Sequence, residues 1–460
     1  MKETNMLFTT DKLFLPRLFS IVMPILLQNL LNASLNFIDV FMIGQLGETA
    51  VAAVGSANQY FFIFIMLMFG LASGAAIFTA QFWGARDMQG IRSFMGIGLF
   101  LTLGISVLFT ALTLIFPGPI LMLFTGDASV ISSGIVYLRI IAWMFVPLSV
   151  GVTFSVVLRS TENVIYPMAA SFIGIALNTV LNYALIFGNF GFPALGVSGA
   201  AYATVIARFV EMSIVVAITY GKKLPAAAGI TELLRFKALQ MKEYLYRSMP
   251  VVAQSAGWAL GYSTYSMIYG HLSTESLAAF NISGSVERIC LMFFTGLGSA
   301  CAIMVGNRIG AGENEKARSY AASFLTIAMM LALIISVLLL LLRNPIVGLY
   351  NFNETSRLYV RGILLVMALI MWAKGANIIF HMGIFKAGGD TLFSMFVDVG
   401  GVWLIGVPIA AVAGFIFGMP VHLIVELLTA EEIIKMSVGM ARLRSGRWLH
   451  NLVQKTAVEA

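Results

Sequence analysis

Charged side chains are scarce in this sequence. Asp, Glu, Lys and Arg make up only 11% of its 460 residues, whereas hydrophobic residues make up 59% and the mean hydropathy is +0.92. A soluble domain carries about 25% charged residues, because its surface must be solvated by water. The shortage of charge therefore excludes a water-soluble protein and indicates a protein that lipid surrounds.

Cysteine and histidine are also rare. Cys290 and Cys301 lie eleven residues apart in one apolar segment that we predict to be helical, so they cannot pair with each other. The four histidines show no metal-ligand spacing, and no glycine-rich loop ends in Gly-Lys-Ser or Gly-Lys-Thr. We therefore expect no cofactor, no direct use of ATP, and no enzymatic nucleophile–base set.

Long apolar runs account for nearly the whole chain, which excludes a separate soluble domain. Helices need about 20 apolar residues to cross a membrane, and the first run is too long for a cleaved signal peptide. Twelve segments qualify, near 17–43, 51–82, 93–116, 132–158, 164–188, 197–220, 244–270, 276–306, 318–342, 358–385, 391–416 and 419–441. We predict an N-terminal lobe over 1–220, a cytoplasmic linker over 221–243 and a C-terminal lobe with a basic tail over 244–460.

The basic residues are distributed unevenly between alternate loops. With the N-terminus placed in the cytoplasm, 21 of the 28 Lys and Arg residues fall in inside segments, three in outside loops and four within or at the edge of spans. Cytoplasmic loops are enriched in Lys and Arg. We therefore predict that both termini are cytoplasmic, and this distribution explains the net charge of +7 without nucleic acid.

The two halves of the sequence resemble each other at a constant offset, which carries Gly70 onto Gly296. Gly70–Ile77 aligns with Gly296–Ile303, and nine of the 24 positions that begin there are identical. This offset corresponds to a shift of six spans, and an even number preserves orientation. The repeat predicts an all-α integral membrane protein with twelve transmembrane helices in two pseudo-symmetric six-helix lobes, an arrangement of secondary transporters that bind substrate between repeats.

One carboxylate within a span stands alone. Asp39, near the outer end of the first span, has no basic residue within one helical turn. An isolated buried carboxylate can exchange a proton for a metal cation; the alternative is a helix-end aspartate in contact with interfacial water. Asn178 and Asn182, one turn apart, and Thr204 in the next span provide either oxygen ligands for Na⁺ or hydrogen bonds between helices.

Other polar residues within spans have more than one interpretation. Arg208 and Glu211 stand three residues apart on one helix face and neutralise each other. Lys374 and Asp398 lie at similar depth in neighbouring spans, so we hypothesise an intramembrane pair with a structural or gating role. Pro24 in the middle of the first span removes a backbone hydrogen bond and permits a kink. The 26 Met and 35 Phe residues suit a cavity for cationic or amphipathic molecules, although most pack helices or face lipid.

Three stretches carry a resemblance to a known family. They read NFIDVFMIGQLG at 36–47, ALNTVLNYALIFGNFGFPALGVSGAAYAT at 176–204 and FKAGGDTLF at 385–393. They resemble the multidrug and toxic compound extrusion (MATE) family, and the resemblance extends over all twelve spans. It implies efflux of organic cations driven by inward movement of Na⁺ or H⁺. It assigns the coupling-cation site to the residues Asp39, Asn178, Thr204 and nearby Tyr137, and a bending role to Pro24.

The sequence departs from this family at two places. Asn182 stands where some relatives carry a second aspartate, which weakens the expectation of tight Na⁺ binding at Asp39, Asn178, Asn182 and Thr204. No acid follows Pro250, where many relatives carry a glutamate. Gln254 and Trp258 are expected to line the substrate cleft instead. We add Asn32 and Lys374 to the predicted cleft.

The sequence-based prediction is a monomeric secondary antiporter of the bacterial inner membrane. It would export cationic or amphipathic small molecules by alternating access, in exchange for Na⁺ or H⁺. A flippase for lipid-linked precursors, of the same superfamily, is the first alternative, but such proteins need more deep cationic residues than Arg288 and Lys374. A channel is the second alternative, and the two-lobe repeat argues against it.

Overall fold

The computed structural model describes residues 8–350 and 352–454, except for the side chain of Asn36. Helices make up nearly all of this part of the chain, and it contains no strand. The chain divides by its internal contacts into two compact units. The N-terminal unit is Met23–Val252, and the C-terminal unit consists of the described residues of 1–22 and 253–460.

Both divisions between the units fall inside a helix. The first lies between Val22 and Met23 in α1 (Phe14–Gly44), and the second between Val252 and Ala253 in α10 (Ala238–Leu272). Pro24 and Pro250 lie close to these points, and the offset of the sequence repeat carries one proline onto the other. A proline inside a helix removes one backbone hydrogen bond and crowds the preceding turn. Each helix can therefore bend where it passes from one unit to the other.

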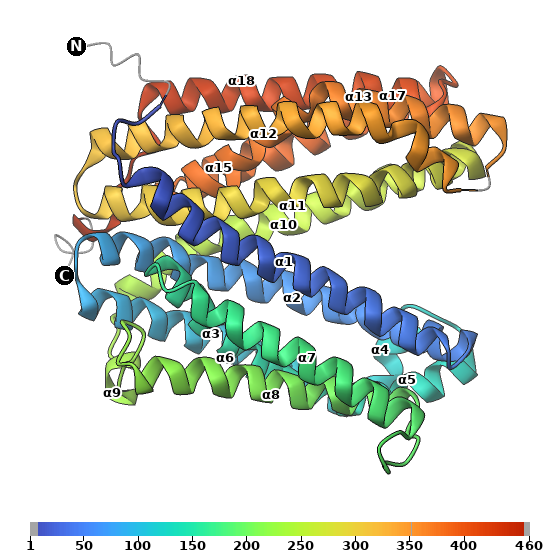
Figure 1. Ribbon diagram of the computed structural model, residues 1–460, viewed down its shortest axis with the longest axis horizontal. Coiled ribbons are helices and arrows are strands. Elements are labelled where there is room, and N and C mark those ends of the chain that lie inside the picture. The colour runs from blue at the N-terminus through green and yellow to red at the C-terminus, as the bar shows by residue number, and fades with distance from the viewer. Residues whose placement is uncertain (1–7, 351, 455–460) are drawn as a thin grey trace. The chain divides into compact units, whose positions relative to one another are not determined.

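The N-terminal unit contains six membrane-length helical segments, coloured blue to green in Figure 1. The antiparallel pair α7 and α8 runs side by side along its length in that view. Besides part of α1 and α10, the elements are α2 (Glu48–Gly84), α3 (Met88–Ile115), α4 (Pro117–Met122), α5 (Ala128–Ile141), the 3₁₀ turn η1 (Ala142–Met144), α6 (Phe145–Ser160), α7 (Ile165–Phe187), α8 (Val197–Gly221) and α9 (Ile230–Leu233).

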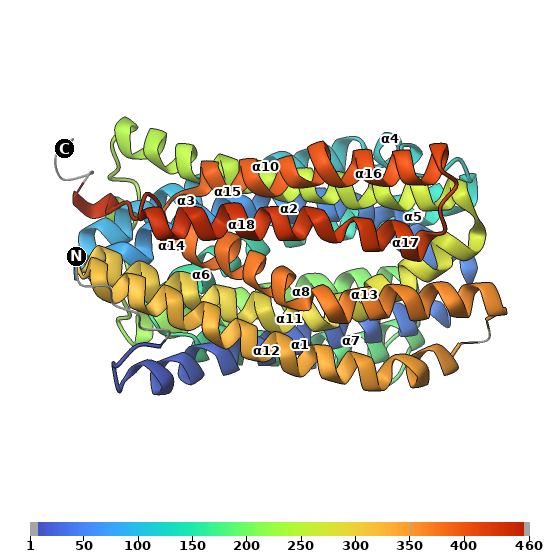
Figure 2. The same cartoon turned by 90° about the horizontal axis from the view of Figure 1, so that it is seen from above.

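The C-terminal unit is also helical, and three π-helical turns interrupt its later helices. The helices α12 and α13 run side by side in Figure 2. The elements are α11 (Thr274–Gly310), α12 (Asn314–Gly348), α13 (Glu354–Ile378), η2 (Ile379–Ile384), α14 (Phe385–Ala387), α15 (Thr391–Gly400), η3 (Gly401–Gly406), α16 (Val407–Ala411), η4 (Val412–Ile416), α17 (Val421–Leu427) and α18 (Thr429–Ser445).

The helices follow the twelve predicted spans. Within the described residues, ten continuous helices are long and apolar enough to cross a membrane, with α5–α6, α13–α14 and α15–η4 each counting as one. The other two spans correspond to α10, which is 35 residues long but richer in Ser and Tyr, and to the pair α17–α18, which carries Glu431, Glu432 and Lys435. The structure thus confirms the all-α membrane architecture of two six-helix lobes.

The repeat appears directly in the helix boundaries. Both ends of α2 map onto the ends of α11 at the same offset that relates Gly70 to Gly296. The first residues of α3 and α12, and those of α7 and α15, are related in the same way. Internal duplication therefore preserved helix register, which side-chain packing inside each bundle depends on.

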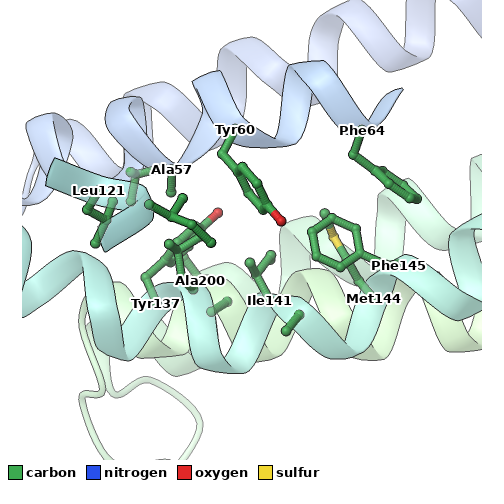
Figure 3. Packing of buried hydrophobic residues seen from close by; sticks show 14 of the residues in the cluster. Ala57, Tyr60, Phe64, Leu121, Tyr137, Ile141, Met144, Phe145 and Ala200 are labelled. Carbon is green, nitrogen blue, oxygen red and sulfur yellow. The ribbon is translucent and has the colours of Figure 1, made fainter. Parts of the chain in front are cut away.

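Aromatic side chains form much of the core of the N-terminal unit. Figure 3 shows Tyr60 and Phe64 of α2 facing Tyr137 and Phe145, which come from α5 and α6. The ring centroids of Phe64 and Phe145 are 4.5 Å apart, and Phe64 is fully buried. Such packed rings contribute about 0.5–1.5 kcal/mol per pair beyond their buried area. This core holds α2, α5 and α6 together.

The segment before α1 is attached to the C-terminal unit by charges and rings. The hydroxyl of Tyr320 donates to Asp11 Oδ2 at 2.5 Å, and the N–H of Leu13 donates to Asp11 Oδ1 at 2.9 Å. Arg308 lies 3.6 Å from the same carboxylate. A little further on, Phe14 is fully buried against Tyr320. These contacts fix the start of α1 outside its membrane-spanning part.

The ionised form of Asp11 stabilises the folded protein. The hydrogen bonds from Tyr320 and Leu13, with the charge of Arg308, hold the pKa of Asp11 below its ordinary value of 3.8. A lowered folded-state pKa stabilises the native state above that ordinary value, and the stabilisation disappears as the pH falls through the folded pKa. We expect Asp11→Asn to lower the midpoint of thermal unfolding in detergent at pH 7, and the difference from wild type to shrink below about pH 4.

Glu315→Gln provides the control for this comparison, because the side chain of Glu315 is 83% exposed. It should leave the unfolding midpoint unchanged at either pH. An Asp11→Asn difference that stayed the same from pH 7 to pH 3 would contradict the role of the ionised carboxylate.

Candidate cation site

Asp39 lies near the C-terminal end of α1, where its side chain is partly exposed. The facing residues come from the hairpin of α7 and α8. Gly188 directly follows α7 and terminates it with a positive φ of 76°, and Gly196, at φ 55°, directly precedes α8. This tight connection brings Asn178 and Asn182 of α7 beside Thr204 of α8, as the sequence predicts.

Hydrogen bonds connect Asp39 to both helices of this hairpin. The amide Nδ2 of Asn182 donates to Asp39 Oδ1 at 2.6 Å and to Asn178 Oδ1 at 3.0 Å. Asn178 Nδ2 then donates to Thr204 Oγ1 at 3.3 Å, and the Thr204 hydroxyl donates to the carbonyl of Ala200 at 3.0 Å. The structure therefore brings together four of the five residues predicted for the cation site in one bonded chain.

One oxygen in this series of hydrogen-bonded residues accepts no hydrogen bond. Both amide hydrogens of Asn182 are used, whereas its Oδ1 is buried without a hydrogen-bond partner, and the residue is only 1% exposed. A buried acceptor without a partner is unfavourable by about 1–3 kcal/mol. A bound cation or a proton-bearing ligand would satisfy this oxygen. Amide, hydroxyl and carboxylate oxygens are the donors that a hard cation such as Na⁺ takes, so the residues present fit such an ion.

The donor set differs from that of a transition-metal centre. In the described part of the chain, no group of three or more His, Cys, Asp or Glu residues is arranged to hold a metal ion. The Asp39 group supplies one carboxylate and neutral oxygens. Its charge matches one monovalent cation, H⁺ or Na⁺.

Tyr137, the fifth predicted residue, lies in the aromatic core of the N-terminal unit. It is 7% exposed on α5 and lies among the core side chains of Figure 3. Its phenol interacts electrostatically with Asp39. Among the contacts of the described residues, no hydrogen bond joins Tyr137 to Asp39, so its part in the cation site stays a prediction.

A second polar chain crosses the N-terminal unit along the same three helices. Gln28 Nε2 of α1 donates to Ser171 Oγ of α7 at 2.7 Å, and Ser171 Oγ donates to Glu211 Oε1 of α8 at 2.5 Å. Arg208 Nη1 binds the other oxygen of Glu211 at 2.6 Å, which confirms the predicted Arg208–Glu211 pair. Sequence reasoning missed Gln28 and Ser171. Their spacing offered a signal, because Ser171 lies two helical turns before Asn178 on the same face.

The hypothesis of a Lys374–Asp398 pair is wrong. Lys374 of α13 forms a salt bridge with Glu287 of α11. Asp398 of α15 instead contacts Lys435 Nζ at 3.2 Å and accepts from Gln254 Nε2 at 2.9 Å. Sequence reasoning placed Lys435 among the inside segments, yet its side chain is 6% exposed. Similar depth did not decide the pairing, because helix packing brings each lysine closest to a different acid.

The residues predicted for the substrate cleft lie in both units. Trp258 of α10 is 50% exposed and stacks on Tyr262 with ring centroids 5.7 Å apart. Asn32 is partly exposed on α1, two helical turns before Asp39. Gln254 and Lys374 are engaged by Asp398 and by an acid of α11, as described above. Asn32 thus belongs to the N-terminal unit, and the other three residues belong to the C-terminal unit.

The two cysteines do not pair with each other, as their spacing predicts. Cys290 and Cys301 both lie on α11, are buried and form no disulfide.

The fold and this site define a multi-pass membrane transporter, and the comparisons with known proteins agree. The MatE family model matches residues 24–184 and 250–412, which begin at the two helix-bending prolines. The chain belongs to the MatE family of multidrug efflux transporters. The starts of the two matched ranges are equivalent positions of the internal repeat.

Individual relatives match over almost the whole chain. An uncharacterized transporter of Bacillus subtilis, YisQ, is 25% identical over 97% of this chain and 98% of its own length. A probable multidrug resistance protein of Thermotoga maritima, NorM, is 25% identical over 94% of this chain and 92% of its own. The crystal structure of the Vibrio cholerae MATE transporter VcmN, in a mutant form, matches with a TM-score of 0.85 at 18% identity, over 94% and 96% of the two chains.

The new assignment of Lys374 has a direct consequence for stability. Both members of the Lys374–Glu287 pair are about three-quarters buried. Removing one partner leaves an uncompensated charge, which destabilises a protein by up to about 3–5 kcal/mol when burial is complete. We expect Lys374→Met to lower the thermal unfolding midpoint in detergent, and Lys374→Met with Glu287→Gln to recover most of the loss.

Asp398→Asn provides the matched comparison. Combined with Lys374→Met it should give no recovery, because Asp398 belongs to Lys435 and Gln254. Recovery with Asp398→Asn but not with Glu287→Gln would restore the original pairing hypothesis.

Proposed function

We propose that this chain is a secondary active antiporter that exports cationic or amphipathic small molecules in exchange for Na⁺ or H⁺. The observation that carries this proposal is the polar group at Asp39. It combines one carboxylate, two amides and a hydroxyl with a buried oxygen of Asn182 that has no partner. An exchangeable monovalent cation fits both the charge and the oxygen donors of this group.

Cation binding at Asp39 would act on α1 through charge neutralisation. Asp39 and Pro24 belong to the same helix, and the division between the two units falls beside Pro24. When a cation neutralises Asp39, the hydrogen bond from Asn182 to its carboxylate becomes weaker, because it loses the contribution of the negative charge. The part of α1 beyond Pro24 can then shift against α7 and α8. In this mechanism the shift of α1 couples cation entry to substrate release by alternating access.

The proposed substrate contacts combine an aromatic face with polar side chains. Trp258 offers an exposed ring on which an organic cation can stack. Asn32, Gln254 and Lys374 remain proposed cleft residues, of which Asn32 is the one on the same helix as Asp39. The proposal places the chain as a monomer in the bacterial inner membrane, in contact with lipid, with both termini in the cytoplasm.

Asp39 is the residue on which coupled transport should depend. We expect Asp39→Asn to abolish efflux of a fluorescent organic cation from proteoliposomes, both under an imposed pH gradient at fixed Na⁺ and under a Na⁺ gradient at clamped pH. Neutral Asn keeps the size of the side chain but holds no exchangeable charge. The wild type should respond to one of the two gradients, and this response identifies the coupling ion.

Asp87→Asn is the matched control, because Asp87 caps α3 by accepting the N–H of Gly90, and Asn caps helices equally well. Its efflux should equal that of the wild type. Wild-type coupled transport in Asp39→Asn would sink the proposal. Translocation of a labelled lipid-linked precursor by the same preparation, without efflux of the dye, would favour the flippase alternative.

A second variant tests the charge of the site. Asn182→Asp would add a carboxylate beside Asp39 without changing the length of the side chain. Extra ligand charge strengthens cation binding, so we expect the half-activating cation concentration to fall by about tenfold, with the larger gain for Na⁺. The measurement is the initial efflux rate against cation concentration. An unchanged activation curve would mean that Asn182 does not contact the ion.

A further inference from the structure

One arginine of the C-terminal unit lies deep in a membrane-crossing helix and has no acid beside it. Arg288 belongs to α11, and at 1.5 Å per residue it lies about 20 Å from the start of this helix and about 33 Å from its end. Its neighbour in the sequence, Glu287, is paired with Lys374. Among the described residues, no salt bridge includes Arg288. Its positive charge is therefore not neutralised by the protein.

The side chain of Arg288 is exposed on the surface of the folded chain. A charged side chain at this depth is strongly unfavourable against lipid hydrocarbon, so charged residues within spans face the protein interior or a water-filled cavity. The exposed face of α11 at Arg288 is therefore a polar surface of the C-terminal unit. An anionic ligand that reaches this surface meets a positive charge in surroundings of low dielectric constant, where a charge pair is stronger than in water.

Two hydrogen bonds orient the guanidinium without neutralising it. Arg288 Nη1 donates to the hydroxyl of Tyr262 on α10 at 3.4 Å, and Nη2 donates to Ser285 Oγ at 2.8 Å. A guanidinium has five N–H groups, so three of them have no acceptor among the described residues. A carboxylate takes two such N–H groups at once, in the bidentate geometry that arginine favours.

An aromatic surface lies directly beside this guanidinium. Tyr262 stacks on Trp258 with ring centroids 5.7 Å apart and planes at 22°, and it contacts Phe280 at 5.0 Å on α11. Trp258 is 50% exposed, so part of its ring is open to a ligand. Gly284 leaves the space that this arrangement needs, because a Cβ there would stand 2.6 Å from the Tyr262 hydroxyl.

We propose that Arg288, Tyr262 and Trp258 form a binding site for a planar aromatic molecule that carries a carboxylate. The carboxylate pairs with Arg288, and the aromatic ring stacks on Trp258. Tyr262 is a positioning residue, since its ring supports Trp258 and its hydroxyl orients Arg288. The proposal rests on the proposed function, which supplies an amphipathic small molecule to be transported, and it narrows that class to aromatic acids and zwitterions.

A pair of dyes that differ only in their charge tests this site. A rhodamine with a free carboxylate and the methyl ester of the same rhodamine share one ring system, and the ester lacks the negative charge. We expect Arg288→Gln to raise the Kd of the acid by about tenfold, the effect of losing a charge-assisted hydrogen bond, and to change the Kd of the ester by less than about twofold. The measurement is fluorescence anisotropy of each dye with the purified full chain in detergent.

Three further variants separate charge, stacking and folding. Arg288→Lys keeps the charge but lacks the planar fork, so its Kd for the acid should lie between those of wild type and Arg288→Gln. Trp258→Leu should raise the Kd of both dyes by a similar factor. Arg361→Gln, which replaces an exposed arginine of α13, is the matched control and should change neither Kd. The unfolding midpoint of Arg288→Gln should equal that of wild type, because no ion pair is lost.

Equal losses for acid and ester in Arg288→Gln, or no loss for either, would overturn the proposal. Displacement of the acid dye by a lipid-linked phosphate at a lower concentration than by the unlabelled aromatic acid benzoate would also overturn it, in favour of a phosphate ligand. Dye binding requires no ion gradient. Full coupling in Asp39→Asn together with selective loss of the acid in Arg288→Gln would therefore reject the proposed antiport and retain this site. Loss of coupling in Asp39→Asn without that selectivity would reject only this inference.

Discussion

A polar group inside a lipid-surrounded helix bundle must find its partner within the protein. This requirement organises the N-terminal unit around Asp39. The carboxylate is met by Asn182 at 2.6 Å, and each further donor in the chain meets another acceptor, as far as Ala200 on α8. The oxygen of Asn182 is a fully buried atom of this hydrogen-bonded series that no protein group satisfies. In a bundle built to this rule, an unsatisfied oxygen beside a carboxylate points to an exchangeable ligand.

The two units satisfy the same requirement in different ways. The C-terminal unit supplies its own cations, because Lys374 is held by Glu287 and Lys435 by Asp398 and Glu431. The N-terminal unit pairs Glu211 with Arg208, whereas the hydrogen bond to Asp39 comes from the neutral amide of Asn182. Gene duplication therefore preserved helix lengths and register, while the buried charges of the two repeats diverged. This asymmetry is the reason that the proposed cation site lies in the N-terminal unit.

Two prolines lie where α1 and α10 pass between the units. Pro24 and Pro250 lie at equivalent positions of the repeat, beside the points where α1 and α10 pass between units. Gln28 follows Pro24 by one turn and anchors α1 to Ser171, whereas Asp11 anchors the segment before α1 to Arg308 and Tyr320. Side-chain contacts therefore hold α1 on both sides of the turn at Pro24, which lacks one backbone hydrogen bond. A change of charge further along α1 acts on a helix that has one place to bend.

The sequence by itself determined the membrane class, the number of spans and the repeat, because hydropathy and residue spacing are local properties of the chain. It also determined the Arg208–Glu211 pair, whose members share one helix. Only the tertiary structure decided which distant charges meet. Lys374 and Asp398 lie at similar depth in the sequence-predicted spans, which suggested that they pair. Packing of α13 on α11 instead pairs Lys374 with Glu287, and packing of α15 near α18 pairs Asp398 with Lys435. The free oxygen of Asn182 and the link from Gln28 to Glu211 likewise emerged only from packing, because they depend on side chains from three helices.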